Sequence, residues 1–84
     1  MKREISFENA TASIPLGKWR HFKGGEYEVI GIAKDSETLA PVVVYRALYG
    51  DGGLWTRDAA MFLETVVRDG VEMRRFTFLE KDDV

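Results

Sequence analysis

The chain contains no cysteine, and this absence removes several kinds of chemistry at once. Without thiols there is no disulfide, no thiolate nucleophile and no cysteine-based zinc or iron–sulfur site. The single histidine, His21, is too little for an ordinary transition-metal site, and the carboxylates lack the spacing of a calcium-binding loop. The sequence therefore predicts that no metal ion or other cofactor is bound and that hydrophobic burial holds the fold.

Long apolar runs are also missing. The longest, Leu39 to Tyr45, is far shorter than the roughly 20 residues needed to cross a bilayer. The first four residues, 1–4, are mostly charged, and no apolar stretch of signal-peptide length follows them. We therefore expect a cytoplasmic location and no membrane contact.

Neither sign of charge dominates the sequence. It holds 12 Lys and Arg against 14 Asp and Glu, a net charge of −2. The distribution is uneven, because residues 17–34 carry four cations against two acids and residues 76–84 carry one cation against three acids. A chain that is acidic overall is a poor general binder of polyanions, since nonspecific affinity depends on the number of phosphates neutralised. Any nucleic-acid binding is therefore expected to be local.

The 84 residues, 45% of them hydrophobic, suffice for one compact domain and not for two. From Gly17 onward, turn signals separate runs rich in Val, Ile, Tyr, Phe and Trp, a pattern typical of a small all-β barrel of five to six antiparallel strands. Asp58 is a good helix N-cap, so a single helical turn is expected at Ala59 to Phe62. The expected strands are Lys18 to Phe22, Tyr27 to Lys34, Val42 to Leu48, Leu54 to Arg57, Thr65 to Arg68 and Val71 to Leu79.

The two ends of the chain are expected to lie outside the barrel domain, which would span residues 17–79. Residues 1–16 are rich in small polar residues and predict a flexible lead-in, with one short edge strand at Ile5 to Phe7. Residues 80–84 predict an acidic tail. A β-rich domain with free edges can also self-associate, so the sequence leaves the oligomeric state open.

The turns have a physical basis in glycine. Gly24-Gly25 and the glycine-rich stretch 50–53 permit positive φ between successive strands. Asp69-Gly70 suits the central positions of a type I′ turn, and folding there places Thr65 opposite Arg74 and Val66 opposite Met73. Each of these three stretches predicts a hairpin.

The candidate site residues are aromatic and basic. In residues 17–25 cations alternate with aromatics around the only histidine, and outside the obvious core runs there is an excess of Trp, Tyr and Arg, the types enriched at interface hot spots. We expect a non-enzymatic module that binds a peptide or protein partner. The alternative for each aromatic is ordinary core packing with the cations solvated. The expected rim consists of Trp19, Arg20, His21, Tyr45, Tyr49, Asp51, Trp55 and Arg57.

Two other functions are kept open. Lys18, Arg20 and Lys23, with their aromatic neighbours, form a strip of the kind that binds RNA or single-stranded DNA. His21 as a general base oriented by Asp51 is the nominal catalytic pair that the sequence offers. The spacing of these residues does not require a catalytic role, and we expect no enzyme activity. The glycine-rich loop does not precede a helix, so it predicts a flexible hairpin loop rather than a phosphate site.

Longer strings carry a family resemblance. GKWRHFKG at 17–24, YEVIGIAKDSETL at 27–39, VVYRALYGDGGLW at 43–55 and MFLETV at 61–66 resemble a family of short bacterial proteins known only as a domain of unknown function, number sixteen fifty-three. The resemblance implies an SH3-like small β-barrel and brings no activity, substrate or cofactor. Trp19 stands where the family often has Tyr, and Asp58 where it often has Pro; both changes keep a suitable residue type.

Overall fold

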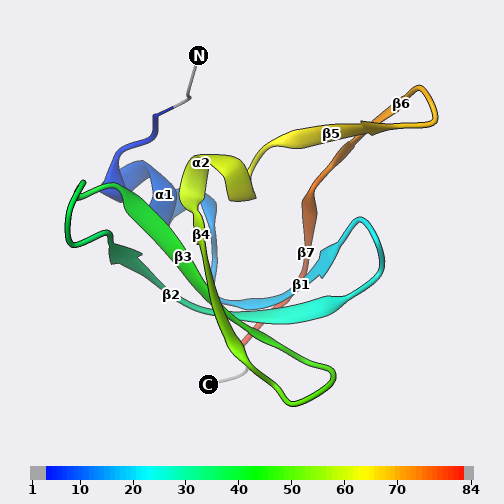
Figure 1. Cartoon of the computed structure of the whole chain (residues 1–84), viewed down its shortest axis with the longest axis horizontal. Helices are drawn as coiled ribbons and strands as arrows, with labels where there is room; N and C mark the ends of the chain where they lie inside the picture. Colours follow the sequence, from blue (N-terminus) through cyan, green and yellow to red (C-terminus); the bar gives the residue numbers. More distant parts are fainter. Residues whose placement is uncertain (1–3, 83–84) are drawn as a thin grey trace.

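The computed structural model describes residues 4–82, which form a mainly β domain, as predicted (Figure 1). Neither helix in this range has the length and hydropathy needed to span a bilayer. In chain order the elements are α1 (Phe7–Ser13), β1 (Gly17–His21), β2 (Glu26–Lys34), β3 (Pro41–Ala47), β4 (Leu54–Asp58), α2 (Ala59–Phe62), β5 (Thr65–Arg68), β6 (Val71–Arg74) and β7 (Phe76–Lys81).

Five strands form one antiparallel sheet in the order β4-β3-β2-β1-β7, and β5 and β6 form a separate two-stranded sheet. The β5–β6 hairpin extends away from the rest of the domain (Figure 1). Within residues 4–82, β4 and β7 lie at opposite ends of the strand order and do not pair with each other. The sheet is therefore open at β4 and at β7, without the pairing that would close it into the expected barrel.

One face of the five-stranded sheet carries the core and is called the inner face; the opposite face is the outer face. In β3 the buried residues Val43, Tyr45 and Ala47 alternate with residues on the outer face. This period of two is what a strand with one buried face produces. Phe62 of α2 and Phe76 of β7 pack among these side chains, so the core lies between the sheet and the short helix.

The predicted β5–β6 hairpin is confirmed in its turn and in its register. Asp69 and Gly70 have φ values of 53° and 75°, as a type I′ turn requires. Thr65 pairs with Arg74 and Val66 with Met73. The turn residues alone were sufficient to set this register.

The expected single strand from Val71 to Leu79 is wrong, because the chain bends at Arg75. The N–H of Arg75 donates to the carbonyl of Glu64 at 2.9 Å, and the carbonyl of Arg75 accepts from Phe22 N–H at 2.9 Å. β6 therefore pairs with β5, whereas β7 joins the other sheet beside β1.

β7 also continues past the expected end of the barrel, since Lys81 pairs with Gly17. The first residues of the expected acidic tail therefore belong to the sheet. Residues 83–84 of that tail lie outside the described residues.

The expected lead-in is also corrected: an α-helix stands where an edge strand was expected. The Ser6 hydroxyl accepts from Asn9 N–H at 3.1 Å and caps α1. Ala10 and Ile14 are buried and belong to the core, so residues 4–16 are part of the packed domain. Residues 1–3 of the lead-in lie outside the described residues. The apolar spacing of Phe7, Ala10 and Ile14 is helical, and this signal was available in the sequence.

Candidate functional site

Two of the expected rim residues, Trp19 and Tyr45, belong to the core. Their side chains are only 3% and 5% exposed. The Trp19 indole N–H donates to the Pro15 carbonyl at 3.1 Å, and its ring meets Phe62 edge-on with centroids 5.2 Å apart. Ordinary core packing, the alternative considered for these aromatics, describes both residues.

The basic strip around β1 is divided between the outer face of the sheet and the turn that follows the strand. Lys18 and Arg20 alternate with the inward-facing Trp19 and so lie on the outer face. There Lys18 pairs with Glu80 at 3.4 Å and Arg20 with Glu26 at 2.9 Å. Lys23 lies beyond the strand, with its ammonium 5.8 Å from the ring centroid of Phe22. These three cations do not form one surface.

Trp55 and Arg57 face inward from β4. Trp55 pairs with Tyr45 and Arg57 with Val43, and directly opposite residues share a face of the sheet. Arg57 Nε donates to the Tyr45 hydroxyl at 3.4 Å, and its guanidinium lies 5.7 Å from the centroid of the Phe76 ring. Trp55 is 58% exposed, so the inner face reaches solvent at this end of the sheet.

His21 is half-buried and also packs against Phe76. Its ring lies 4.5 Å from Phe22 and 4.9 Å from Phe76, centroid to centroid. The pKa of His21 is lowered from its usual 6.5, first by burial and then by the positive charges of Arg57, Arg75 and Lys23. The electrostatic environment of the imidazole is therefore cationic.

Two tyrosines extend this surface. The hydroxyls of Tyr27 and Tyr49 are hydrogen-bonded, and their rings meet edge-on with centroids 5.5 Å apart. Burial, followed by the hydrogen bond to Tyr49, raises the pKa of Tyr27 to about 12. A Cβ at Gly25 would lie 3.1 Å from the Tyr49 ring, a tight contact that a substitution could relieve only by a small shift of that ring. Tyr49 itself is 54% exposed.

Together these side chains make one aromatic and cationic surface, here called the inner-face cluster. Arg75 belongs to it through its charge on His21, and Arg75 Nε is buried without a hydrogen-bond partner. The ion pairs found within residues 4–82 are those of Lys18 and Arg20, so no carboxylate in that range pairs with Arg57 or Arg75. The cluster consists of His21, Tyr27, Tyr49, Trp55, Arg57 and Arg75.

Sequence reasoning missed Tyr27 and Arg75. The Gly24-Gly25 hairpin carried a signal for the first, since it places Tyr27 directly opposite Trp19. No pattern in the sequence indicated Arg75 as a site residue, because its position depends on the bend that separates β6 from β7.

Asp51 has a local structural role. Its Oδ1 accepts from Gly53 N–H at 3.1 Å, within the loop where Gly50 and Gly52 adopt φ values of 59° and 70°. His21 Nδ1 accepts from Lys23 N–H at 3.2 Å. Each member of the nominal catalytic pair therefore has its own backbone partner. Within residues 4–82, no group of three or more His, Asp or Glu residues is arranged to hold a metal ion.

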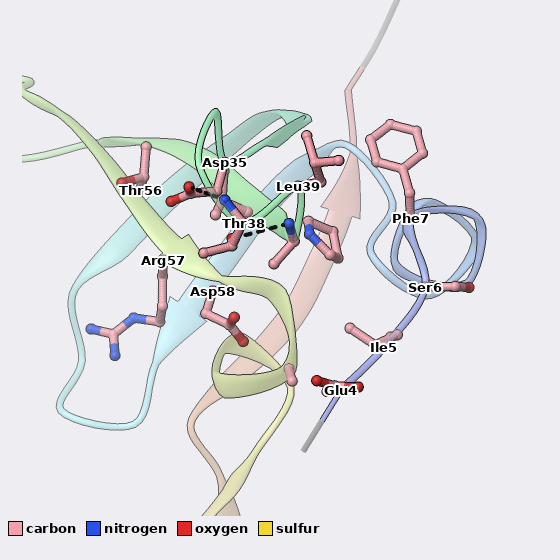
Figure 2. Close-up of a pocket in the computed structure, with 14 residues that line it drawn as sticks. Glu4, Ile5, Ser6, Phe7, Asp35, Thr38, Leu39, Thr56, Arg57 and Asp58 are labelled. Atoms are coloured by element: carbon pink, nitrogen blue, oxygen red, sulfur yellow. Dashed lines mark hydrogen bonds between the residues drawn. The ribbon is translucent and has the colours of Figure 1, made fainter. Parts of the chain in front are cut away.

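A groove of about 700 Å³ lies on the outer side of β4, between residues 4–7 and the loop that precedes β3 (Figure 2). Thr56, Arg57 and Asp58 of β4 line it, and the Arg57 side chain points away from Phe7 and Leu39 (Figure 2). Its carboxylates have structural partners: Asp35 accepts from the N–H groups of Glu37 and Thr38 at 2.8 and 3.0 Å, and Asp58 from that of Met61 at 3.2 Å. β4 thus lies between the groove and the inner-face cluster, and Arg57 belongs to both.

The fold and the cluster define a mainly β domain with one open antiparallel sheet and an aromatic, cationic inner face. Residues 17–78 match the family described as protein of unknown function DUF1653, and the chain belongs to this family. It is similar to a crystal structure of a DUF1653 protein from Bordetella bronchiseptica, with 32% identity and a TM-score of 0.77, over 87% of this chain and 96% of that one. No curated protein matches the chain.

Proposed function

We propose that this protein is a non-enzymatic binding module that holds an acidic peptide segment of a protein partner on its inner-face cluster. The observation that supports this proposal is the concentration of Arg57, Arg75 and His21 beside exposed aromatic rings, without a carboxylate paired to either arginine in residues 4–82. A carboxylate ligand would accept charge-assisted hydrogen bonds from these guanidiniums. Trp55 and Tyr49 would supply the apolar contact area typical of interface hot spots.

A peptide is favoured over RNA or single-stranded DNA by the distribution of charge. The net charge is −2, and the outer-face cations Lys18 and Arg20 are paired with Glu80 and Glu26. A nucleic acid gains most of its affinity from many neutralised phosphates, and a small cluster offers few such contacts. A short acidic segment needs only the charges that the cluster holds.

The test is fluorescence anisotropy with a fluorescein-labelled octapeptide of alternating Glu and Val, compared with the same peptide carrying Gln in place of Glu. The Glu peptide is expected to bind and the Gln peptide to bind much more weakly. Arg57→Gln is expected to weaken binding about tenfold, the loss of one charge-assisted contact. Arg20→Gln, which removes the same charge from the outer face, is the matched control and is expected to leave binding unchanged.

Two results would contradict the proposal. Equal affinities of the Glu and Gln peptides would show that the cations do not recognise carboxylates. Tighter binding of a labelled oligothymidine, with a steep loss of affinity as salt is added, would assign the surface to single-stranded nucleic acid.

A further inference from the structure

β4 is an open edge of the sheet, and its hydrogen-bond pattern shows which backbone groups are free. Ala47 N–H donates to the Gly53 carbonyl at 3.0 Å, so these two residues form a hydrogen-bonded pair. Such pairs alternate along an antiparallel ladder, so Trp55 and Arg57 bond to β3. The N–H and C=O groups of Leu54 and Thr56 therefore point outward, away from β3.

The two open edges of the sheet differ in how they are protected. Natural edge strands are commonly blocked by charged residues, proline or a bulge. β7 carries Glu80 and Lys81, and its pairing with β1 has a register shift between Lys18 and Trp19. β4 also carries two charged residues, Arg57 and Asp58, but it contains no proline and its pairing with β3 is regular. Leu54 and Trp55 are each 58% exposed on it.

The charges beside the two edges also differ. Arg57 stands on the inner face of β4, and Asp58 on its outer face, since Asp58 pairs with the outward-facing Val42. On the outer face near β7, the pKa of Glu28 is raised by a hydrogen bond with Asp82 and by the charge of that carboxylate, so acidic groups already crowd there. An acidic segment is therefore attracted to the inner side of β4, whereas near β7 it meets Glu28, Glu80 and Asp82 together with Lys18 and Lys81.

We propose that the partner peptide binds as an added strand along β4, antiparallel to it, with its acidic side chains on the inner face beside Arg57. Its alternate, apolar side chains then lie beside Leu54 and Thr56 on the outer face. Main-chain hydrogen bonds to the outward groups of Leu54 and Thr56 supply affinity, and the cluster supplies selectivity. This inference rests on the proposed function, and it adds the conformation and the register of the bound segment.

The decisive experiment changes the peptide and leaves the protein intact. In an antiparallel pair, hydrogen-bonded residues lie directly opposite and share a face, so the peptide residues bonded to Thr56 are the Val residues. In the alternating Glu–Val octapeptide, N-methylation of two central Val amides is expected to weaken binding about tenfold or more. N-methylation of two central Glu amides is the matched control and is expected to be tolerated.

The outcomes separate the two proposals. If N-methylation of Glu weakens binding and that of Val does not, the added strand runs parallel, and the proposed antiparallel register is overturned. If both peptides bind equally well while Arg57→Gln still weakens binding, strand addition is overturned and the proposed function survives. If the unmodified peptide does not bind, the proposed function fails and strand addition fails with it.

A variant of the protein provides an independent measurement. Proline is tolerated on an edge strand where its missing N–H would face outward. Thr56→Pro is therefore expected to abolish peptide binding while the circular dichroism spectrum stays unchanged, and Thr56→Val is expected to bind normally. Sedimentation of the free protein is expected to show a monomer. A dimer that Thr56→Pro dissociates would assign the β4 edge to a second copy of the chain and overturn the proposal.

Discussion

The rings of Phe62 and Phe76 stack face to face, with centroids 4.1 Å apart and an angle of 7° between their planes. Phe62 follows β4 at one end of the sheet, and Phe76 begins β7 at the other. Both side chains are fully buried, and Trp19 and Tyr45 meet Phe62 edge-on. This stack connects the two ends of the open sheet, β4 and β7, which share no backbone hydrogen-bond ladder within residues 4–82.

Removing half of the stack is expected to be among the most destabilising changes in the chain. Phe62→Ala should lower the free energy of unfolding by about 3–5 kcal/mol, because it leaves a cavity in the core. Urea denaturation measures this loss against the roughly 4–13 kcal/mol expected for a domain of this size. Leu79→Ala, at a half-exposed position, is the control. A similar loss of unfolding free energy there would show that the Phe62–Phe76 stack stabilises the fold no more than an ordinary partly exposed side chain does.

The helix that precedes the sheet is expected to contribute to stability. Ile14 is buried at 1% exposure, so Ile14→Ala should cost about 2–5 kcal/mol. Leu16, 47% exposed, serves as the matched position, and Leu16→Ala should cost well under about 1 kcal/mol. Thermal denaturation of the two variants compares them directly. Equal effects would mean that Ile14, the C-cap of α1, packs too weakly to stabilise the sheet.

Acid should destabilise the fold through His21. Because the pKa of His21 is lowered from 6.5 in the folded protein, the unfolded chain binds this proton more tightly. The stabilising contribution of the neutral imidazole is therefore complete above pH 6.5 and is lost as the pH falls below that value. His21→Asn should remove this part of the pH dependence of unfolding.

Nuclear magnetic resonance can follow this titration without ambiguity, since the chain has one histidine. Arg57→Gln should move the pKa of His21 back toward 6.5, because it removes one of the positive charges that lower it. A His21 pKa at or above 6.5 in the unmodified protein would contradict the cationic environment described for the cluster.

Glycine at position 17 is expected to be required. Gly17 has a φ of 141°, and a Cβ there would lie 2.2 Å from the Glu80 carbonyl oxygen of the neighbouring strand β7. Gly17→Ala should therefore destabilise the fold by more than about 2 kcal/mol. Gly31→Ala is the control, because a Cβ at Gly31 meets no atom within 4 Å. Comparable melting temperatures for the two variants would refute this requirement.

Local chemistry explains why much of the β structure was predictable. Both bounds of β5 were predicted correctly, and each bound of β1, β2, β3 and β4 was predicted to within one residue. The reason is that the turn residues fix where the strands end; they are Gly24-Gly25, the glycines of 50–53 and Asp69-Gly70. The helical turn of α2 was predicted from the Asp58 cap, whose Oδ1 accepts from Met61 N–H. The break at Arg75 was not predictable, since it depends on hydrogen bonds to Glu64 and Phe22, which are distant in sequence.

The sequence predicted the residue types of the site correctly, but only some of the predicted residues lie in it. His21, Tyr49, Trp55 and Arg57 lie in the inner-face cluster, whereas Trp19 and Tyr45 are buried. A Trp or Tyr in a strand has the same appearance in sequence whether its face is covered or open. Trp19 and Tyr45 are covered by the ring of Phe62, a residue of α2.

The sequence by itself determined which kinds of chemistry are available to this protein, and it determined most of the local structure. The lack of cysteine, the single histidine and the turn glycines are properties of composition and of neighbouring residues, which need no fold to act. Tertiary structure decided which cations are neutralised and which backbone edge is exposed. Arg20 and Arg57 are the same residue type, but the alternation of strands gives one a carboxylate on the outer face and places the other beside His21 on the inner face. That difference depends on register between strands, which only the folded chain establishes.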